Sequence, residues 1–396
     1  MKKRSLPIVA TVVALSILIP VFALDAYEAL RGPTEVLYYD KAKAYKGYTL
    51  FGAGRNETYL IDMEGNMINT WPGTSNPQML ENGNVLGRSS KDGFAGYKEF
   101  DWKGNVVWEY YEKREGYHPH HDHQRIYNPK LQEYTTIYIA NKDLTHDEVI
   151  AAGADPSWSE SYDGSQMDAI VEVDMNGKVV WEWWFFDHLV QDLDPTRANY
   201  VGKGTIGSYP GKLNINYGMA VGQDWLHCNS LDFNRESDHI VINSVHGEFF
   251  VIDHGATFVP GDPEKSRELA AGDAGDFLYR WGDPARYAQG EKPYIERDCS
   301  RSNTGTRQMG ACHDIQWIRE GLPGAGNFLV FDNADMVYQS SQQSGAIEIN
   351  PHLDLYGNDT GNYVNPPDAG YHMTNPDFRT THQLPRQLST QIVWSW

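Results

Sequence analysis

A turn motif that recurs along the chain restricts the possible folds more than any other feature of the sequence. In each copy an apolar segment leads into Asp-x-x-Gly, and an alternating segment ending in Trp follows; the copies are Tyr59–Trp71, Glu99–Trp108 and Val171–Trp181. The Asp opens a tight turn, and the Gly supplies the positive φ of a hairpin with a G1 bulge. A weaker copy surrounds Ile252 and Asp253, and Ile392–Trp394 resembles the last strand of another. The pattern predicts successive β-hairpins.

Repeats of about 40–50 residues, each with several short strands, are typical of β-propeller blades. No helical periodicity persists over a long window, and only short pieces such as Pro263–Ala271 are candidate helices. We therefore expect one all-β domain, a β-propeller, over residues 25–396. A β-sandwich with coincidental hairpins is the alternative. Because Trp396 lies within an apparent blade strand, the completeness of the last blade stays open.

The N-terminal segment has the pattern of an export signal. Met1–Arg4 is basic, Leu6–Leu24 carries no charge, and Val21–Ala23 offers small residues before Asp25. Residues 1–24 are therefore predicted to be a signal peptide. An uncleaved membrane anchor is the alternative, since the uncharged stretch is just long enough to span a bilayer. Either way we expect an exported protein.

The charge of the chain restricts its partners. Lys and Arg number 33 against 53 Asp and Glu, which gives a formal net charge of −20. Such a protein repels phosphate backbones, so we expect no nucleic-acid partner. Any anionic substrate must be held by local donors.

Three cysteines in an exported chain predict one disulfide and one free thiol. Cys299 and Cys312 flank a polar loop that needs a covalent link, so we expect the bridge there. Cys228 is then the free thiol, and its neighbour Leu226 favours a buried position. A nucleophilic Cys228 is the alternative.

Histidines gather in three motifs. They are His118-Pro-His120-His121-Asp122-His123, Asp224-Trp-Leu-His227-Cys-Asn229-Ser, and Cys312-His313-Asp314. Equivalent positions of successive blades face a common centre, so these imidazoles are expected to converge. Three interpretations stay open: satisfied polar residues that brace the blades, a metal site, or an anion-transfer site with imidazoles as nucleophile and donors. A metal would be held by His118, His120 and His123, but strand alternation sends His120 and His121 to opposite faces.

Taken in order, these phrases resemble the bacterial aryl-sulfate sulfotransferase family over roughly residues 45–396. The resemblance rests on the hairpins ending in Val-Val-Trp-Glu, the three histidine motifs, Phe331-Asp332-Asn333 and Trp184-Phe-Phe-Asp187-His188. It implies a six-bladed periplasmic propeller. It also implies transfer of a sulfuryl group from a phenolic sulfate ester to a phenol, without the nucleotide donor PAPS and with no cofactor. The reaction would be ping-pong, through a sulfated histidine.

Carried over by motif, the resemblance makes His313 the nucleophile. His227 would act as acid/base and oxyanion donor, and His121 as a second donor. Substrate binding would involve Asn229, His246 and Asp314. Family members also hold a disulfide before the nucleophile, in agreement with Cys299–Cys312.

One position departs from the family pattern. Where the family has an Arg that binds the sulfuryl group, this chain has Val245, in Asn243-Ser-Val245-His246. Valine makes no charged contact with an oxyanion. His246, Arg125 or Arg307 could compensate. The alternative function is therefore a non-catalytic propeller that binds a ligand or a protein. The oligomeric state and the natural substrates stay open.

Overall fold

The protein is described here by a computed structural model that covers Val36 and residues 38–53, 57–159, 165–217, 224–290, 306–333, 344–365, 371–373 and 387–395. The predicted signal segment 1–24 and Cys299 lie outside these residues. The chain divides into two compact units. The N-terminal unit comprises Met1–Ser89 and Tyr97–Glu109, and the C-terminal unit comprises Ser90–Gly96 and Tyr110–Trp396.

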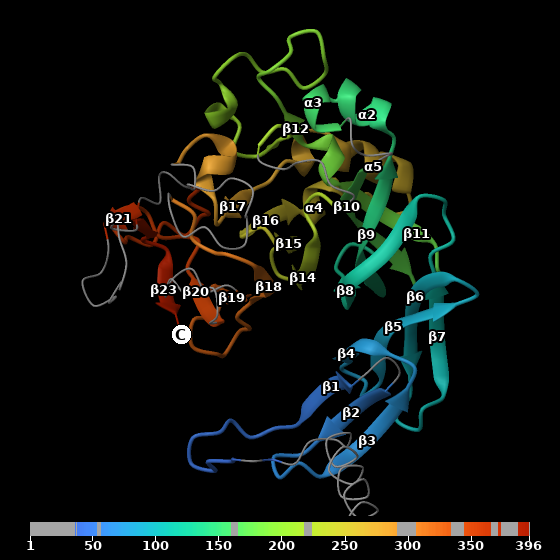
Figure 1. The fold of residues 1–396 in the computed structure, drawn as a ribbon. Helices are drawn as coiled ribbons and strands as arrows, with labels where there is room; N and C mark the ends of the chain where they lie inside the picture. Colours follow the sequence, from blue (N-terminus) through green and yellow to red (C-terminus); the bar gives the residue numbers. More distant parts are fainter. Residues whose placement is uncertain are drawn as a thin grey trace, which may run out of the picture. The chain divides into compact units, whose positions relative to one another are not determined.

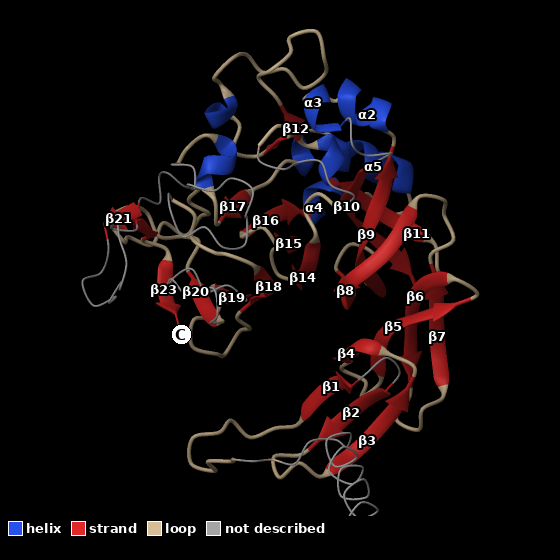
Figure 2. Cartoon of the chain, in the orientation of Figure 1, coloured by secondary structure: helices blue, strands red, loops and turns tan. Residues whose placement is uncertain are grey.

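The N-terminal unit consists mainly of two antiparallel sheets (Figures 1 and 2). The first has the order β1-β2-β3, with β1 Thr49–Ala53, β2 Glu57–Ile61 and β3 Met67–Pro72. The second has the order β4-β5-β6-β7, with β4 Ser75–Met79, β5 Val85–Lys91, β6 Phe94–Phe100 and β7 Val106–Tyr111. In both sheets each strand pairs with its neighbours in sequence, as in a propeller blade.

The C-terminal unit contains three four-stranded antiparallel sheets of the same kind. The first is formed by β8 Tyr117–Asn128, β9 Glu133–Leu144, β10 Ser165–Asp174 and β11 Val179–Trp184. The second is formed by β14 Cys228–Asn234, β15 His239–Ser244, β16 Glu248–Asp253 and β17 Tyr279–Trp281. The third is formed by β18 Cys312–Trp317, β19 Phe328–Asp332, β20 Gly345–Ile349 and β23 Ile392–Ser395.

The remaining elements are short. They are the parallel pair β12 Leu189–Val190 and β13 Leu213–Asn214, the pair β21 Tyr371–Met373 and β22 Gln387–Ser389, the helices α2 His146–Ala151, α3 Pro156–Ser159, α4 His254–Thr257 and α5 Pro263–Ala271, and the 3₁₀ turns η1 Phe185–Asp187, η2 Ile206–Ser208, η3 Asp273–Gly275 and η4 Pro284–Tyr287. The predicted helix over Pro263–Ala271 is confirmed. Asp262 caps it by accepting from the N–H of Lys265. None of the helices in the described ranges is long and apolar enough to cross a membrane.

The all-β prediction is confirmed, and the sheets are of the propeller-blade type, but the described residues form five blades instead of the six expected. Between β11 and β14 the described chain forms only turns and the short pair β12–β13. That segment contributes buried apolar side chains such as Leu189, Leu213 and Ile215 to the core, but its strands β12 and β13 are only two residues long and do not extend into a four-stranded sheet. β23 is not left unpaired, because it hydrogen-bonds to β20 as the fourth strand of its sheet.

The predicted hairpins are confirmed at all three strong copies of the turn motif. The turn carboxylates accept two backbone N–H groups each at 2.8–3.0 Å, and the glycines have φ of 83°, 84° and 78°; the residues are Asp62 with Gly65, Asp101 with Gly104, and Asp174 with Gly177. A further copy, which the sequence analysis missed, lies at Asp354 and Gly357. At Asp253 the weaker copy is not a hairpin, because its carboxylate caps α4.

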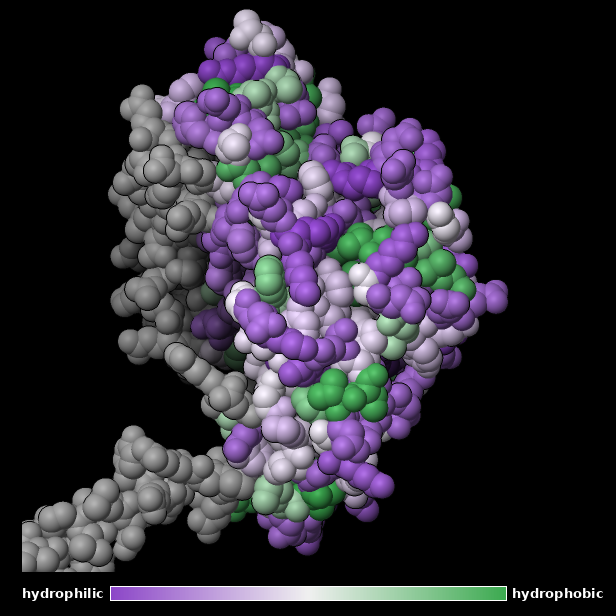
Figure 3. All heavy atoms as spheres, turned by 90° about the vertical axis from the view of Figure 1, so that its right-hand side faces the viewer, coloured by the Kyte–Doolittle hydropathy of each residue, from purple (hydrophilic) through white to green (hydrophobic). Residues whose placement is uncertain are grey.

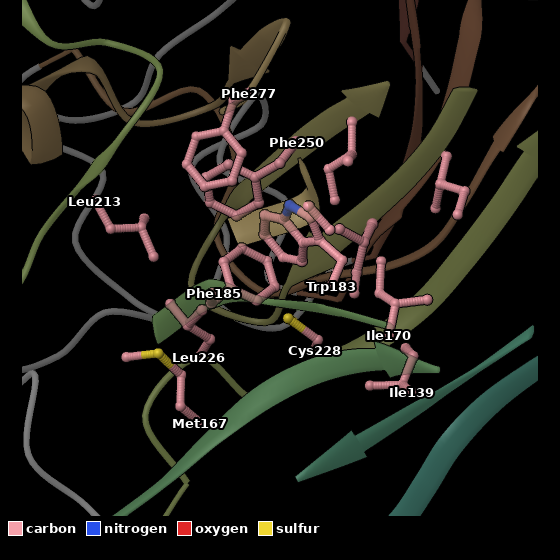
Figure 4. Close-up of a cluster of buried hydrophobic side chains, with 14 of the residues drawn as sticks. Ile139, Met167, Ile170, Trp183, Phe185, Leu213, Leu226, Cys228, Phe250 and Phe277 are labelled. Atoms are coloured by element: carbon pink, nitrogen blue, oxygen red, sulfur yellow. The ribbon is translucent and has the colours of Figure 1, made fainter. Parts of the chain in front are cut away.

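The largest hydrophobic core of the described residues lies in the C-terminal unit and combines aliphatic with aromatic side chains. Trp183, Phe185, Phe250 and Phe277 pack ring against ring, and Cys228 lies among them (Figure 4). The face shown in Figure 3 is mostly hydrophilic, with hydrophobic residues in small separate groups. The core packs the sheets of β8–β11 and β14–β17 against each other, and the first strands of these sheets carry two of the histidine motifs.

Candidate functional site

The three histidine motifs lie at the first strands of the three sheets of the C-terminal unit: His118–His123 on β8, His227 directly before β14, and His313 on β18. β14 packs against both of the others. Each strand loses its regular pairing at the motif: the register shifts between Pro119 and His123, between Cys228 and Ser230, and between His313 and Gln316. Such bulges re-aim side chains and are common beside active sites.

Residues with positive φ mark the same three places. The φ angles are 46° at His121, 47° at His227 and 52° at Asp314. This left-handed conformation is unfavourable for residues other than glycine and persists where the surroundings enforce it. Backbone strain therefore coincides with the motifs that the sequence analysis singled out.

Side chains of one first strand hydrogen-bond to the backbone of the next. The N–H of Leu231 donates to the carboxylate of Asp122 at 3.0 Å, and the N–H of Ile315 donates to the hydroxyl of Ser230 at 2.9 Å. Two residues further on, the N–H groups of Phe233 and Trp317 donate to Gln124 and Asp232 at 3.0 and 2.9 Å. The bonds repeat with the same spacing, so they fix the register between the three strands.

Because of this register, equivalent residues of the three strands lie side by side, in one row across the strands. Asp122 and Ser230 occupy matching positions, and Asp314, just before Ile315, is the third. The preceding residues are His121, Asn229 and His313. His121 and His313, which lie far apart in the sequence, thus occupy corresponding positions on the first and third of these sheets, with Asn229 at the same position of the sheet between them.

His121 and His227 are in direct contact. Their ring centroids lie 4.7 Å apart with the planes at 71°. His120 joins them, because its ring lies 5.1 Å from that of His121 and the two Nδ1 atoms are 2.8 Å apart. The prediction that His120 and His121 face opposite sides of the strand is therefore wrong. Alternation holds only in a regular strand, and the bulge with its positive φ at His121 brings both side chains together.

Each end of this imidazole cluster meets a carboxylate. Nδ1 of His227 lies 2.5 Å from Asp224, and this hydrogen bond, with the charge of the carboxylate, raises the pKa of His227. Nε2 of His120 lies 3.0 Å from a carboxylate oxygen of Asp168, although the two are not aligned for a hydrogen bond. The carboxylate of Asp168 also accepts from the N–H of Cys228 at 3.3 Å.

The ring of His313 is anchored through Nδ1. This atom lies 3.0 Å from the carbonyl oxygen of Ala311 and 3.2 Å from the amide nitrogen of Asn333. A carbonyl oxygen only accepts hydrogen bonds and an amide NH₂ group only donates them, so the two contacts cannot both be hydrogen bonds in one tautomer of the ring. The shorter contact, with Ala311, places the proton on Nδ1. The ring is half-buried. Nε2 is then the basic nitrogen of the neutral ring.

A buried amide network ties β14 to the strand of His313. The amide groups of Asn229 and Asn243 both donate to the carbonyl oxygen of Cys312, at 3.1 and 2.7 Å. Asn243 also donates to Asn229 at 3.0 Å. Asn229 therefore holds the backbone of the residue before His313. Asp314, the residue after His313, is exposed.

The residues expected to replace the missing arginine are engaged elsewhere. Burial, together with the charges of Arg286 and Arg307, lowers the pKa of His246 to about 3, so this imidazole is neutral. The guanidinium of Arg307 donates to the carbonyl oxygens of His246 and Gly310. Arg125 contacts the sulfur of Met175 in the turn between β10 and β11. The backbone N–H of Val245 donates to the carbonyl of His227 at 3.2 Å, so the backbone at this position lies beside that of His227.

The alternative metal site does not form. His118 is exposed and lies 2.9 Å from Asp143, His120 contacts Asp168, and His123 is buried. Across the described ranges no group of three His, Cys, Asp or Glu side chains could hold a metal ion. These three imidazoles therefore lie in different environments and do not form a common site.

The predicted Cys299–Cys312 disulfide is not seen. Cys312 is a free, buried thiol whose sulfur lies 3.0 Å from the carbonyl oxygen of Ser244, and Cys299 lies outside the described residues. Burial raises the pKa of Cys312 to about 12. Cys228 is also free and fully buried, with its pKa raised by burial, so the buried interpretation is confirmed.

The sequence analysis assigned no role to four residues of the site. Asp224 could have been found, because it precedes His227 by three residues in a tight loop. Asp168 lies on β10, and no local pattern marks it. Asn243 and Asn333 belong to motifs that carry the family resemblance, but their residue types gave them no role. Only the pairing of the sheets brings these three side chains to the histidines.

The fold and the site define an all-β protein of the propeller-blade type with a cluster of imidazoles on its first strands. The sequence model of the family described as Arylsulfotransferase (ASST) matches residues 48–350, so the chain belongs to the arylsulfotransferase family. This match confirms the resemblance derived from the motifs. No curated protein matched significantly. Among solved structures, the chain is similar to a crystal structure of a protein of unknown function from Bacteroides caccae, with 11% identity, a TM-score of 0.35, and coverage of 82% of this chain and 75% of that one.

Proposed function

We propose that the protein moves a sulfuryl group from a phenolic sulfate ester to a phenol in two steps, through a sulfated His313 and without a nucleotide donor. Its family supports an aryl sulfotransferase acting on small aromatic substrates. One observation carries the covalent step: Nδ1 of His313 faces the carbonyl of Ala311. This contact assigns the lone pair to Nε2, which is the form of imidazole that attacks an electrophile.

In the first step Nε2 of His313 attacks the sulfur, an N–S bond forms, and the ester S–O bond breaks. The departing phenoxide takes a proton from His227, whose pKa is raised by the hydrogen bond with Asp224. In the second step the acceptor phenol returns a proton to His227 and its oxygen attacks the sulfur. The N–S bond then breaks and His313 is restored. Protons and charge balance over the cycle.

The sulfuryl oxygens gain negative character as the group moves, and fixed donors stabilise that charge. His121 lies against His227 and at the level of His313, so we assign it this role. Asn229, His246 and Asp314 would support substrate binding. Asn229 does so through the backbone before His313, and His246 as a neutral side chain.

The test is release of 4-nitrophenol from 4-nitrophenyl sulfate with phenol as acceptor. We expect release by the wild type, and its loss in His313→Ala. The matched control is His146→Ala, which removes an exposed imidazole from α2, outside the site. Mass spectrometry of the quenched enzyme with donor alone should show a sulfated peptide that contains His313. Full activity in His313→Ala would exclude the covalent role.

A second candidate function rests on Val245. Because this position holds no cation and His246 is neutral, the site has fewer charged donors than the family pattern implies. A non-catalytic propeller that binds an aryl sulfate or a protein would retain the scaffold without turnover. Binding of 4-nitrophenyl sulfate without release of nitrophenol would favour this function.

We also propose that the protein is exported, as the segment 1–24 and the family resemblance suggest. Detection of the mature protein in a periplasmic fraction, with N-terminal sequencing to distinguish cleavage from anchoring, tests this. Recovery in the cytoplasmic fraction alone would contradict it.

A further inference from the structure

The contact between His120 and Asp168 has no role in the mechanism above. Both side chains are shielded from water, with 12% of His120 and none of Asp168 exposed. An ionised carboxylate buried to this degree is stable only when a counter-charge or strong donors compensate it. The backbone N–H of Cys228 supplies a donor at 3.3 Å, which is long, and the thiol of Cys228 is a weak donor to the same carboxylate. The carboxylate also interacts with the charge of His227, and Nε2 of His120 lies 3.0 Å from it.

We propose that Asp168 holds His120 as an imidazolium, and that His120 acts as a positioning residue for His121 in the sulfuryl transfer proposed above. The inference rests on that proposed function only for the role of His121. The protonation of the two rings follows from the contacts themselves.

The proton count follows from the distance between the rings. The Nδ1 atoms of His120 and His121 are 2.8 Å apart, so one proton lies between them and one of the two nitrogens donates. If His120 is charged through its contact with Asp168, both of its nitrogens carry protons. Its Nδ1 is then the donor and Nδ1 of His121 the acceptor. A neutral His121 must therefore carry its own proton on Nε2.

This tautomer is the one that an oxyanion donor requires. With Nδ1 of His121 engaged by His120, the N–H that His121 can offer to a sulfuryl oxygen is the one on Nε2. The positive charge of His120 withdraws electron density from the ring of His121 and so makes that N–H a stronger donor. The surrounding charges fit this arrangement: Asp224 interacts with His120 and His121 as well as with its own partner His227. The pair would thus place positive charge beside the reacting group in an acidic protein that lacks the arginine.

A second pair on the same strand provides a matched control. His118 is two residues before His120 on β8, and its Nε2 lies 2.9 Å from the carboxylate of Asp143. This contact has nearly the same length, but about half of each side chain is exposed, with 54% of His118 and 49% of Asp143 in water. Asp143→Asn therefore makes the same chemical change as Asp168→Asn at a solvated pair outside the site.

The experiment combines imidazole nitrogen NMR of ¹⁵N-histidine-labelled protein with kinetics on 4-nitrophenyl sulfate and phenol. His120→Asn and His121→Gln spectra assign the resonances. In the wild type at neutral pH we expect His120 protonated on both nitrogens and His121 on Nε2 alone. Asp168→Asn should convert His120 to a neutral ring and lower kcat by about tenfold or more, towards the 10²–10³-fold loss of an oxyanion donor. Asp143→Asn should leave the signals of His120 and His121 and kcat unchanged.

A second pair of variants separates positioning from folding. The amide nitrogen of Asn takes the place of Nδ1 of His, so His120→Asn keeps a donor to His121, whereas His120→Leu does not. We expect His120→Asn to retain the Nε2 tautomer of His121 and more activity than His120→Leu. A neutral His120 in the wild type, or equal kcat in these two variants, would overturn the proposal. If the wild type releases no nitrophenol, the proposed function fails, and the NMR signals still decide the protonation of His120.

Discussion

The Nδ1 atoms of His120 and His121 lie 2.8 Å apart, although these residues are consecutive in a β-strand. A regular strand would separate their side chains onto opposite faces. The bulge in β8 removes that alternation and gives the C-terminal unit a continuous set of contacts from Asp168 through His120, His121 and His227 to Asp224.

Val245→Arg should raise the rate of sulfuryl transfer. The backbone of Val245 is hydrogen-bonded to that of His227, so we expect an arginine side chain at this position to reach the imidazole cluster and to bind the sulfuryl oxygens in a bidentate manner. An added donor of this kind is worth up to about 10²–10³ in rate. The measurement is kcat with 4-nitrophenyl sulfate. Val245→Met controls for side-chain length, and an arginine variant no faster than the methionine variant would argue against a role for charge at this position.

Asp224→Asn should shift the pH dependence of the reaction. The hydrogen bond with Asp224 raises the pKa of His227, and His227 acts as an acid in its protonated form. The rate of the first step therefore falls as pH rises through this pKa. Removing the carboxylate lowers the pKa, so the fall should begin at a lower pH.

The check is the pH profile of the nitrophenol burst in both proteins. Asp147→Asn, beside the exposed His146, is the control and should leave the profile in place. An unchanged profile in Asp224→Asn would mean that another group supplies the proton.

His254 should make stability depend on pH. It is fully buried between Glu172 and Asp238, at 2.9 and 2.6 Å. Burial alone would lower its pKa, but the two carboxylates outweigh burial and raise it to about 9. A raised pKa stabilises the fold fully below the unfolded value of about 6.5, and this stabilisation is lost as pH rises through about 9.

His254→Leu leaves both carboxylates without their imidazolium and should lower the free energy of unfolding by about 3–5 kcal/mol near pH 6. Urea unfolding at several pH values measures this, with His146→Leu as a control on the exposed face of α2. The gap between wild type and His254→Leu should narrow towards pH 9. A gap that does not depend on pH would show that His254 is not charged in the folded protein.

Cys228 and Cys312 should resist thiol reagents in the folded protein. Both are fully buried, and burial raises the pKa of each thiol, to about 12 for Cys312. We expect alkylation of their peptides only after unfolding, as followed by mass spectrometry. Rapid modification of Cys312 under native conditions would contradict its placement. A Cys312 that stays unmodified after unfolding, and reacts only after reduction, would establish the disulfide that was predicted from the sequence.

Local chemistry made much of the fold predictable. The Asp-x-x-Gly turns form as expected because carboxylate, glycine and bulge act within a few residues of one another. The helix at Pro263–Ala271 follows from its cap in the same way. The number of blades was not predictable from such motifs, since it depends on whether the segment between β11 and β14 can pair, and its few residues with sheet character pair only over β12 and β13.

For the site, the sequence alone determined which side chains could take part: His121, His227 and His313 stand out by type and by repeated context. Only the tertiary structure decided how they are used. The ladder of bonds between β8, β14 and β18 puts His121 and His313 at one level, and the bulge adds His120. Asp168 reaches His120 from β10, a different strand of the same sheet. The physical reason is that hydrogen bonds and ion pairs depend on distances in space, which a strand's register and its bulges set and which residue spacing along the chain does not encode.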